Sequence, residues 1–302
     1  MEFRQLKYFL AVAEHLHFTV AAERLGMAQP PLSQQIIKLE REIGTRLFVR
    51  HPRRVELTEA GVIFKERARR ILDDVDDTLE YIKKTVRGES GKLLIGFAGS
   101  TVFHPRVATT LRLFQHSYPG VLVKAQESNS TALLNKVSSG EVDCALVRLP
   151  LDCGTLVVTP LVEEEMIAVL SASHRLAAQR SVDLAQLATD PLILFPREIG
   201  PELYDSIISA CRMLGFSPRI AMESPQISSA VNMVAAGFGV SVIPSSMRHI
   251  HADGVAYLKI RNKGLKTAIA LIARPRDSSA TVRNFVQVLR DVSRGRGPPA
   301  PS

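Results

Sequence analysis

The spacing of apolar residues changes at one short hydrophilic segment, Gly88-Glu89-Ser90-Gly91. Before this segment apolar residues recur every three or four positions, which predicts amphipathic helices. After it, short apolar runs such as Leu93–Phe97 and Cys144–Val147 alternate with helical patterns. That alternation is typical of a parallel, doubly wound α/β sheet. With 302 residues the chain is long enough for more than one domain, so we expect an all-α domain followed by an α/β module.

The first 44 residues predict three helices joined by tight turns. The apolar face of the first helix consists of Leu6, Phe9, Leu10, Ala13 and Leu16. Thr19 is expected to cap a short second helix, and Gly26 to turn the chain after it. Pro30-Pro31 suits the first turn of a third helix, where missing N–H groups cost nothing. This succession is typical of a helix-turn-helix.

Two short strands are predicted next, at Leu47–Arg50 and Val55–Leu57, around a turn that carries Arg53 and Arg54. A hairpin of this kind is what a winged variant adds to a helix-turn-helix. We therefore expect the first domain to be a winged helix-turn-helix.

A long helix is predicted from Thr58, its N-cap, through about Arg87. Its apolar residues step by four and three positions: Ala68, Leu72, Val75, Leu79, Ile82 and Val86. The helix could pack on its own domain, but regular heptad spacing with charged residues on the other faces favours a dimer seam. We predict that Leu72, Val75, Leu79 and Ile82 form this seam.

The net charge of +8 favours binding of a polyanion. The distribution of charge indicates that the N-terminal domain binds it. Basic residues dominate between Arg46 and Arg70, whereas Asp73–Asp77 is acidic. The polar face of the third helix offers amide, hydroxyl and ammonium groups, which can reach base edges and phosphates. The predicted DNA contacts on the third helix and the hairpin are Gln29, Pro30, Pro31, Ser33, Gln34, Gln35, Lys38, Arg50, Arg53 and Arg54.

Five stretches carry a pattern that covers nearly the whole chain: Phe3–Leu10, Ala21–Leu25, Ala28–Ile36, Leu57–Gly61 and Ala235–Pro244. Together they resemble the LysR-type transcriptional regulator family. The resemblance implies a winged helix-turn-helix DNA-binding domain at 1–58, a linker and dimerisation helix at 59–88, and an effector-binding domain at 91–294. That domain would hold two Rossmann-like subdomains, as in periplasmic binding proteins: 91–161 plus 267–294, and 162–266. The composition of residues 295–302 predicts a disordered tail.

The resemblance also implies partners. The protein would bind double-stranded DNA at an inverted-repeat operator and assemble as a homo-oligomer, a dimer of dimers, with RNA polymerase as a candidate partner. A small anionic effector bound between the subdomains would switch it. Because the N-terminal resemblance is strongest to regulators of aromatic-compound degradation, we expect an aromatic carboxylate or dicarboxylate.

Hydroxyl groups follow the strands of the α/β module, at the strand ends where ligands of such sheets bind. Ser100 and Thr101 follow the first strand, Ser130 the second and Arg148 the third. In the resembled family the effector touches the residues matching Ser100, Thr101 and Ser130. Arg148, Phe195, Pro201 and Leu203 would complete the wall.

Other functions fit the sequence less well. A solute-binding component would use only the α/β module, and an apolar signal sequence is not evident, so the protein is expected to be soluble and cytoplasmic. An α/β enzyme would need a catalytic constellation, but Cys144 reads as a buried packing thiol and Glu163-Glu164-Glu165 as the solvated start of a strand. We predict no enzymatic activity, no cofactor and no metal.

Overall fold

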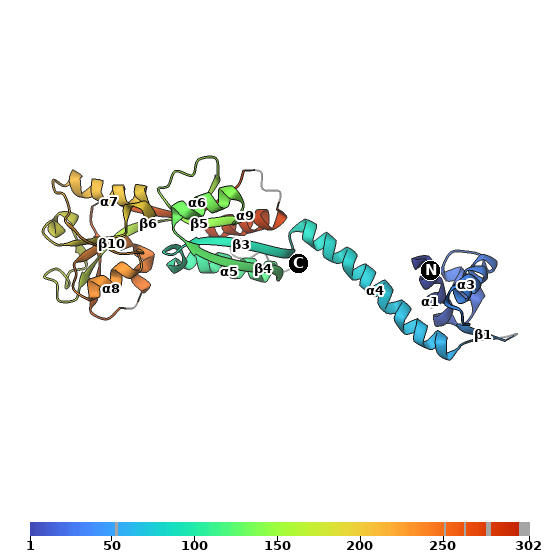
Figure 1. Ribbon diagram of the computed structural model, residues 1–302. Coiled ribbons are helices and arrows are strands. Elements are labelled where there is room, and N and C mark those ends of the chain that lie inside the picture. The colour runs from blue at the N-terminus through green and yellow to red at the C-terminus, as the bar shows by residue number, and fades with distance from the viewer. Residues whose placement is uncertain (52–53, 251, 263, 276–278, 296–302) are drawn as a thin grey trace. The chain divides into compact units, whose positions relative to one another are not determined.

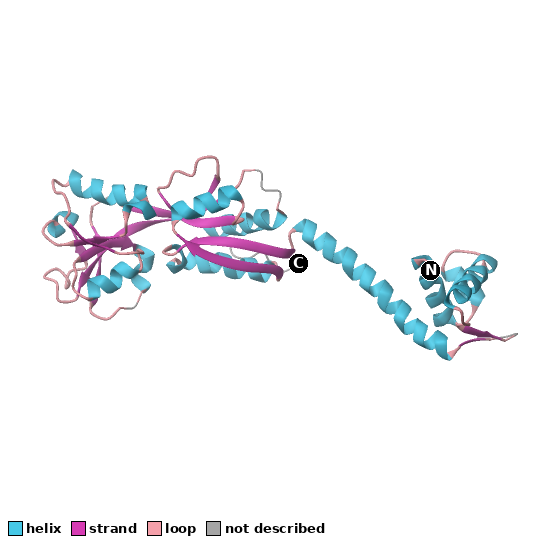
Figure 2. Cartoon of the chain, viewed as in Figure 1, coloured by secondary structure: helices cyan, strands magenta, loops and turns pink. Residues whose placement is uncertain are grey.

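The computed structural model describes the whole chain except residues 52–53, 251, 263, 276–278 and 296–302 (Figure 1). The predicted tail therefore lies outside the described residues from 296 onward. The chain divides into two compact units, Met1–Lys84 and Thr85–Ser302, and each has its own hydrophobic core. The first unit is helical apart from one small hairpin, and the second combines strands and helices (Figure 2). The predicted fold class is confirmed.

The first unit contains the predicted three helices, the hairpin and most of the long helix, whose last three residues belong to the second unit. In chain order the elements are α1 (Phe3–His15), α2 (Phe18–Arg24), α3 (Gln29–Ile43), β1 (Phe48–Arg50), β2 (Val55–Leu57) and α4 (Glu59–Arg87). Helix α2 begins one residue before the predicted cap Thr19, with His17 at the N-cap position. The turn after it contains Gly26, whose φ of +65° is a conformation that glycine adopts without strain. The two strands pair antiparallel, with Phe48 opposite Leu57.

A single core holds this unit together. Leu32, Ile36 and Leu39 form the buried face of α3 and pack with Phe9 of α1 and Phe48 of β1. Burial of each such side chain contributes roughly 1.5–3 kcal/mol relative to exposure. The opposite face of α3 consequently remains available to solvent. Helix α4 begins at the predicted N-cap, because the Thr58 hydroxyl oxygen accepts from the Gly61 N–H at 2.9 Å.

The second unit begins with a lobe of parallel strands between helices, here called the first lobe. Its elements are β3 (Ser90–Ala98), η1 (Thr101–Phe103), α5 (Pro105–Ser117), β4 (Gly120–Ser128), α6 (Ser130–Ser139), β5 (Cys144–Leu149), β12 (Lys266–Ala273) and α9 (Ala280–Ser293). Strand β3 lies between β4 and β5 and is parallel to both, and β12 adds antiparallel to β5. Helices α5 and α9 cover one face of this sheet, and α6 covers the other.

The second lobe repeats this plan with other elements. They are β7 (Ser181–Val182), η2 (Leu184–Leu187), β8 (Leu192–Leu194), η3 (Arg197–Ile199), α7 (Pro201–Met213), β9 (Ile220–Glu223), α8 (Ser229–Ala235), β10 (Val240–Pro244), η4 (Ser245–His249) and β11 (Val255–Ile260). Strands β8, β9 and β10 are parallel, with α7 packed on one face and α8 on the other.

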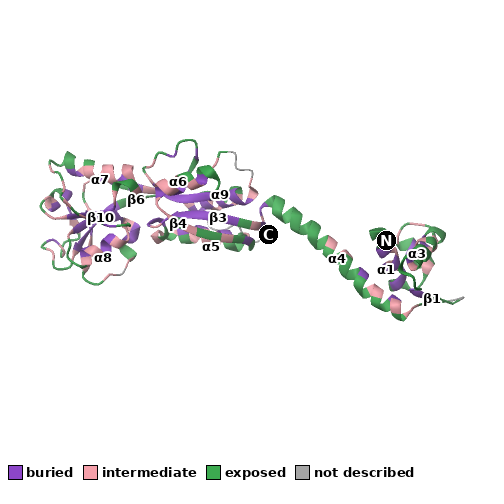
Figure 3. Ribbon diagram, in the orientation of Figure 1, coloured by how far each residue is buried: buried purple, intermediate pink, exposed green. Residues whose placement is uncertain are grey.

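One long strand, β6 (Val157–Ser171), connects the two lobes. Its first part pairs with β12 of the first lobe, and from Met166 onward it pairs with β10 and β11 of the second. The chain thus passes through the first lobe, builds the second and returns through β12. Figure 3 shows the strands of both lobes as the buried layer between their helices. Within the described residues, no helix is both long and apolar enough to cross a bilayer.

Candidate functional site

The solvent-facing side of α3 carries most of the predicted DNA contacts. Pro30, Pro31, Gln34 and Lys38 are exposed, whereas Gln29, Ser33 and Gln35 are half-buried. None of these seven side chains belongs to the core of the unit. The amide groups of Gln34 and the ammonium of Lys38 therefore face solvent, as contacts to DNA require.

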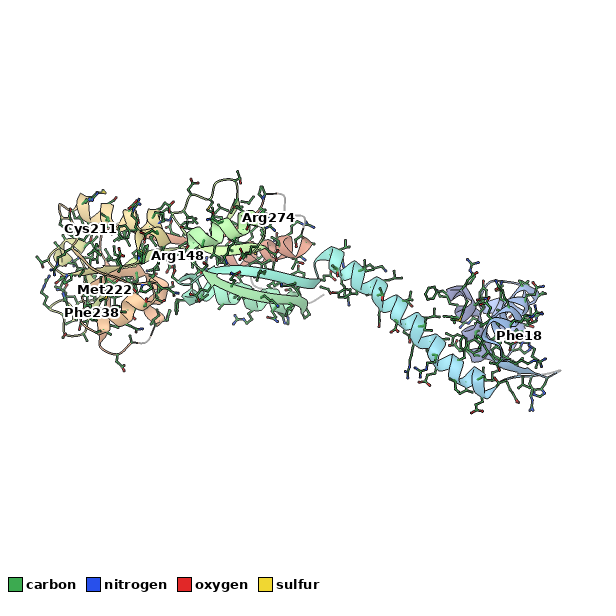
Figure 4. The ribbon with its side chains drawn as sticks, in the orientation of Figure 1. Phe18, Arg148, Cys211, Met222, Phe238 and Arg274 are labelled. Carbon is green, nitrogen blue, oxygen red and sulfur yellow. The ribbon has the colours of Figure 1, made fainter. Side chains whose placement is uncertain are left out.

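Arg50 links the hairpin to α3. Its Nη1 donates to the Ser33 hydroxyl at 3.0 Å, and its guanidinium lies 4.8 Å from the centre of the Phe18 ring, labelled in Figure 4. Glu40 accepts from the N–H groups of Leu47 and Phe48, at 2.8 and 3.1 Å, and so fixes the start of β1 to α3. The hairpin and α3 therefore form one surface.

The predicted hairpin tip carries two arginines. Arg54 is exposed, and its Nε lies 3.0 Å from a carboxylate oxygen of Glu56. Arg53 lies outside the described residues. Arg50 and Arg54 place positive charge along the hairpin, next to the polar face of α3.

The heptad positions of α4 become more exposed along the helix, and Val75 in the middle is half-buried. Ala68 is fully buried and Leu72 half-buried in the core of the first unit, so the start of the predicted seam packs on its own domain. Leu79, Ile82 and Val86 are 52%, 53% and 72% exposed. An apolar row this exposed on one chain is available for a partner helix.

A cavity of about 320 Å³ lies between the two lobes of the second unit. The first lobe contributes Ser100 after β3, Ser130 at the start of α6 and Arg148 of β5. The second lobe contributes Phe195 after β8 and Leu203 of α7. The structure therefore brings together five of the seven residues predicted to surround an effector.

The other two predicted residues do not line the cavity. Thr101 is fully buried, and its hydroxyl donates to the carbonyl of Ala98 at 2.7 Å, so its side chain is used within the first lobe. Pro201 begins α7, and the residues on either side of it along the wall are Gly200 and Leu203.

The cavity also has walls that the sequence did not indicate. Glu127 is the second-last residue of β4 on the first lobe, Leu151 follows β5, and Gln226 and Ile227 follow β9 on the second lobe. Gln226 and Ile227 follow a strand of the second lobe, as Ser100 and Ser130 follow strands of the first. The strand-end rule would have found them if applied to both sets of strands.

Arg148, labelled in Figure 4, lines the cavity and makes three side-chain hydrogen bonds. Its Nε donates to the Ser100 hydroxyl at 2.5 Å, its Nη2 to the Ser100 carbonyl at 2.9 Å, and its Nη1 to Glu164 at 2.8 Å. The Arg148 N–H donates to the Ser130 hydroxyl at 3.3 Å. The arginine therefore positions both serines, and its charge is balanced by Glu164.

The prediction that Glu163-Glu164-Glu165 is the solvated start of a strand is wrong for Glu164. Strand β6 begins earlier, at Val157, and alternation along it turns Glu164 inward while Glu163 and Glu165 stay exposed. Burial disfavours the charged carboxylate, but Arg148 and the donors of Ser246 outweigh it and hold the pKa of Glu164 below its ordinary value. Glu164 thus accepts from Arg148 on one lobe and from the Ser246 N–H, at 2.7 Å, on the other.

No group of three or more His, Cys, Asp and Glu side chains that could hold a metal occurs in the described part of the chain. Cys144 is buried in β5, as expected of a packing thiol. Burial also raises the pKa of the Cys211 thiol to about 11, so this group is far from a reactive thiolate at neutral pH.

Comparisons with known proteins agree with both units. Residues 3–62 match the bacterial regulatory helix-turn-helix protein, lysR family, and residues 87–294 match the LysR substrate binding domain. BudR, an HTH-type transcriptional regulator of Raoultella terrigena, is 42% identical over 95% of this chain and 100% of BudR. The crystal structure of CbnR, a LysR family transcriptional regulator, has a TM-score of 0.86 and 30% identity over 96% of this chain and 100% of CbnR.

A second crystal structure shows full-length CbnR in complex with its target DNA. It has a TM-score of 0.85 and 29% identity, and covers 97% of this chain and 100% of that one. The matched family consists of transcriptional regulators and not of enzymes. The chain therefore belongs to the LysR family of bacterial helix-turn-helix transcriptional regulators, with a DNA-binding N-terminal domain and an effector-binding domain.

Proposed function

We propose that this regulator is switched by a small anionic effector, an aromatic carboxylate or dicarboxylate, that binds in the cavity between the two lobes. The observation that carries the proposal is the two-sided chemistry of this cavity. Ser100, Ser130 and the start of α6 supply hydroxyl and N–H donors on one side. Phe195 and Leu203 supply apolar surface on the other.

The volume of the cavity supports a small ligand. Ligand pockets commonly enclose about 300–1,000 Å³, and this cavity has about 320 Å³. The Asn129 side chain caps α6 by accepting from the Ala132 N–H at 2.7 Å, which leaves the N–H groups of Ser130 and Thr131 to point out of the helix end. A carboxylate there is stabilised by these donors and by the helix dipole.

On the DNA side, we propose that residues 1–58 read an inverted-repeat operator, with Gln29, Ser33 and Gln34 of α3 at base edges and Arg50, Arg53 and Arg54 at phosphates. The linker helix at 59–88 would pair two chains. Two such pairs would form a homotetramer, with RNA polymerase as a further partner. The exposed polar face of α3 and the exposed apolar row of α4 support this assignment.

A mobility-shift assay tests the effector proposal. The DNA would be the region upstream of the protein's own gene, and benzoate and cis,cis-muconate would serve as the carboxylate and dicarboxylate probes. We expect a probe to change the mobility or affinity of the complex. Ser130→Ala should weaken that response roughly ten- to hundredfold in effector concentration, because one hydrogen bond to a charged group is lost.

Two further variants sharpen this assay. Ile227→Trp fills the cavity and should abolish the response without changing operator affinity in the absence of probe. Ser138→Ala is the matched control for Ser130→Ala, since Ser138 is an exposed serine of the same helix, α6, and does not line the cavity. Full response of Ile227→Trp to the probe would place the effector elsewhere.

A further inference from the structure

Two charged side chains line the cavity among the residues that the structure describes, and only one of them can act on a ligand as a net charge. Arg148 is 4% exposed and faces Glu164 at 2.8 Å, so the pair is neutral as a whole. Glu127 is exposed at the end of β4, and no cation within the described chain forms an ion pair with it. The cavity rim therefore carries one uncompensated negative charge.

Glu127 and Gln226, which come from opposite lobes, both lie next to Gly99. A Cβ on Gly99 would stand 2.5 Å from Oε1 of Glu127 and 3.3 Å from Oε1 of Gln226. The carboxylate of the first lobe and the amide of the second thus approach the same point at the cavity. A ligand that fills the cavity therefore lies close to the Glu127 carboxylate and the Gln226 amide.

The nearest basic residue along β4 cannot neutralise Glu127. Lys124 is three positions away, and side chains an odd number of positions apart on a strand point to opposite faces of the sheet. The positive partial charge at the start of α6 can hold one carboxylate, but it lies on the same lobe and is already the proposed site for that group.

From this distribution of charge we infer that the effector carries a single carboxylate, and that Glu127 excludes dicarboxylates and accepts a hydroxyl or another hydrogen-bond donor on the effector. The inference rests on the proposed function and narrows it. A second carboxylate would meet Glu127 as a like charge, whereas a hydroxyl could donate to it in a charge-assisted hydrogen bond. Glu127 thus acts as a specificity-determining residue, and Gln226 lines the cavity from the other lobe.

Calorimetric titration of the full-length protein with matched ring compounds tests this inference. The para series is benzoate, 4-hydroxybenzoate and terephthalate, and the meta series replaces the last two with 3-hydroxybenzoate and isophthalate. In the wild-type protein we expect each dicarboxylate to bind at least about fivefold more weakly than benzoate, the effect of one like charge about 4 Å away in water. In at least one series the hydroxybenzoate should bind more tightly than benzoate.

The Glu127→Gln variant keeps the shape of the side chain and removes its charge. It should strengthen dicarboxylate binding about fivefold and leave benzoate within about twofold. Glu223→Gln is the matched control, because Glu223 is also an exposed glutamate near the cavity but does not line it. High salt should reduce the ratio of benzoate affinity to dicarboxylate affinity in the wild type but not in Glu127→Gln, because salt screens exposed charges.

The outcomes separate the inference from the proposed function. If the probes bind but Glu127→Gln changes all affinities equally, or if dicarboxylates bind the wild type as tightly as benzoate, the inference is overturned and the proposed cavity stands. If no probe binds the wild type or either variant, the aromatic carboxylate effector itself is overturned, and the inference falls with it.

Discussion

Arg148 Nη1 lies 2.8 Å from Glu164 Oε1, and each side chain is 4% exposed. The arginine belongs to β5 of the first lobe, whereas Glu164 also accepts from the Ser246 N–H of the second lobe. This buried pair therefore connects the two lobes, and its arginine lines the cavity. Breaking a buried pair by removing one partner leaves an uncompensated buried charge, which costs about 3–5 kcal/mol.

Glu164→Gln should accordingly destabilise the second unit by about 3–5 kcal/mol, since Arg148 keeps its charge and loses its partner. Unfolding in urea, followed by far-ultraviolet circular dichroism because the chain has no tryptophan, measures the change. The double variant Arg148→Met, Glu164→Leu should recover most of the loss, because both charges are gone.

The exposed pair Lys266 and Glu163 provides the control for this measurement. Glu163 lies beside Glu164 on β6, and its carboxylate is 2.6 Å from the Lys266 ammonium, but both side chains are largely exposed. Lys266→Met should leave stability unchanged within error. Equal losses of stability in Glu164→Gln and Lys266→Met would show that the buried Arg148–Glu164 pair stabilises the protein no more than the exposed pair does.

The same pair predicts a dependence of stability on pH. The pKa of Glu164 is lowered in the folded protein from its ordinary value of 4.5, because Arg148 and Ser246 outweigh the effect of burial. A lowered folded pKa contributes stability that is fully present above the ordinary value and is lost as the pH falls through the folded value. As the pH falls below the ordinary value of 4.5, Glu164→Gln should therefore lose less stability than the wild type, as urea midpoints at each pH would measure. Parallel curves for the two proteins would contradict this assignment.

Much of the fold could be predicted because its signals are local. The apolar face of α3, its proline start and the glycine turn before it lie within a few residues of one another, and each determines a short piece of backbone. The alternation of strands and helices after Gly91 likewise predicts the α/β class. The N-cap of α2 is two residues earlier than predicted, because His17, which makes no capping hydrogen bond, takes that position instead of Thr19.

The cavity was predictable only in part. Ser100 and Ser130 follow strands, so a general rule about strand ends finds them. Glu164, the partner of Arg148, belongs to β6, which passes from one lobe to the other. Three glutamates interrupt the apolar pattern of this strand. Only the three-dimensional pairing of β6 with β12 shows that the middle glutamate faces inward, which no spacing in the sequence reveals.

The three cysteines should be unreactive in the folded protein. Cys144, Cys153 and Cys211 are all buried, and burial raises the pKa of Cys153 as well as that of Cys211. Because the thiolate is the nucleophile, a thiol reagent at pH 7.5 should label none of them within minutes, and all three in urea. Mass spectrometry of the labelled protein measures this. Rapid labelling of Cys153 in the absence of denaturant would mean that the loop after β5 opens.

The variant Gln34→Ala tests whether α3 reads the base sequence of the operator. If the exposed Gln34 amide bonds a base edge, the variant should lose roughly 1–3 kcal/mol on the operator and much less on random DNA. Arg54→Ala on the hairpin should instead weaken binding to both DNAs about equally and reduce the salt slope by about one unit. Fluorescence anisotropy at several salt concentrations distinguishes the two. A uniform loss for Gln34→Ala would reassign this residue to phosphate contact.

The last prediction concerns the seam of α4. Leu79 is 52% exposed on the single chain, so Leu79→Asp should fold normally, and any effect on assembly comes from the partner helix. Across a paired seam the new carboxylate would be buried without a partner, at a cost of several kcal/mol per dimer. Sedimentation should then show smaller particles, and operator affinity should fall because a single winged domain contacts one half-site. Tyr81→Asp is the matched control, since Tyr81 is 59% exposed and lies two positions along the helix, outside the heptad row. If both variants sediment like the wild type, the row from Leu79 to Val86 does not pair the chains.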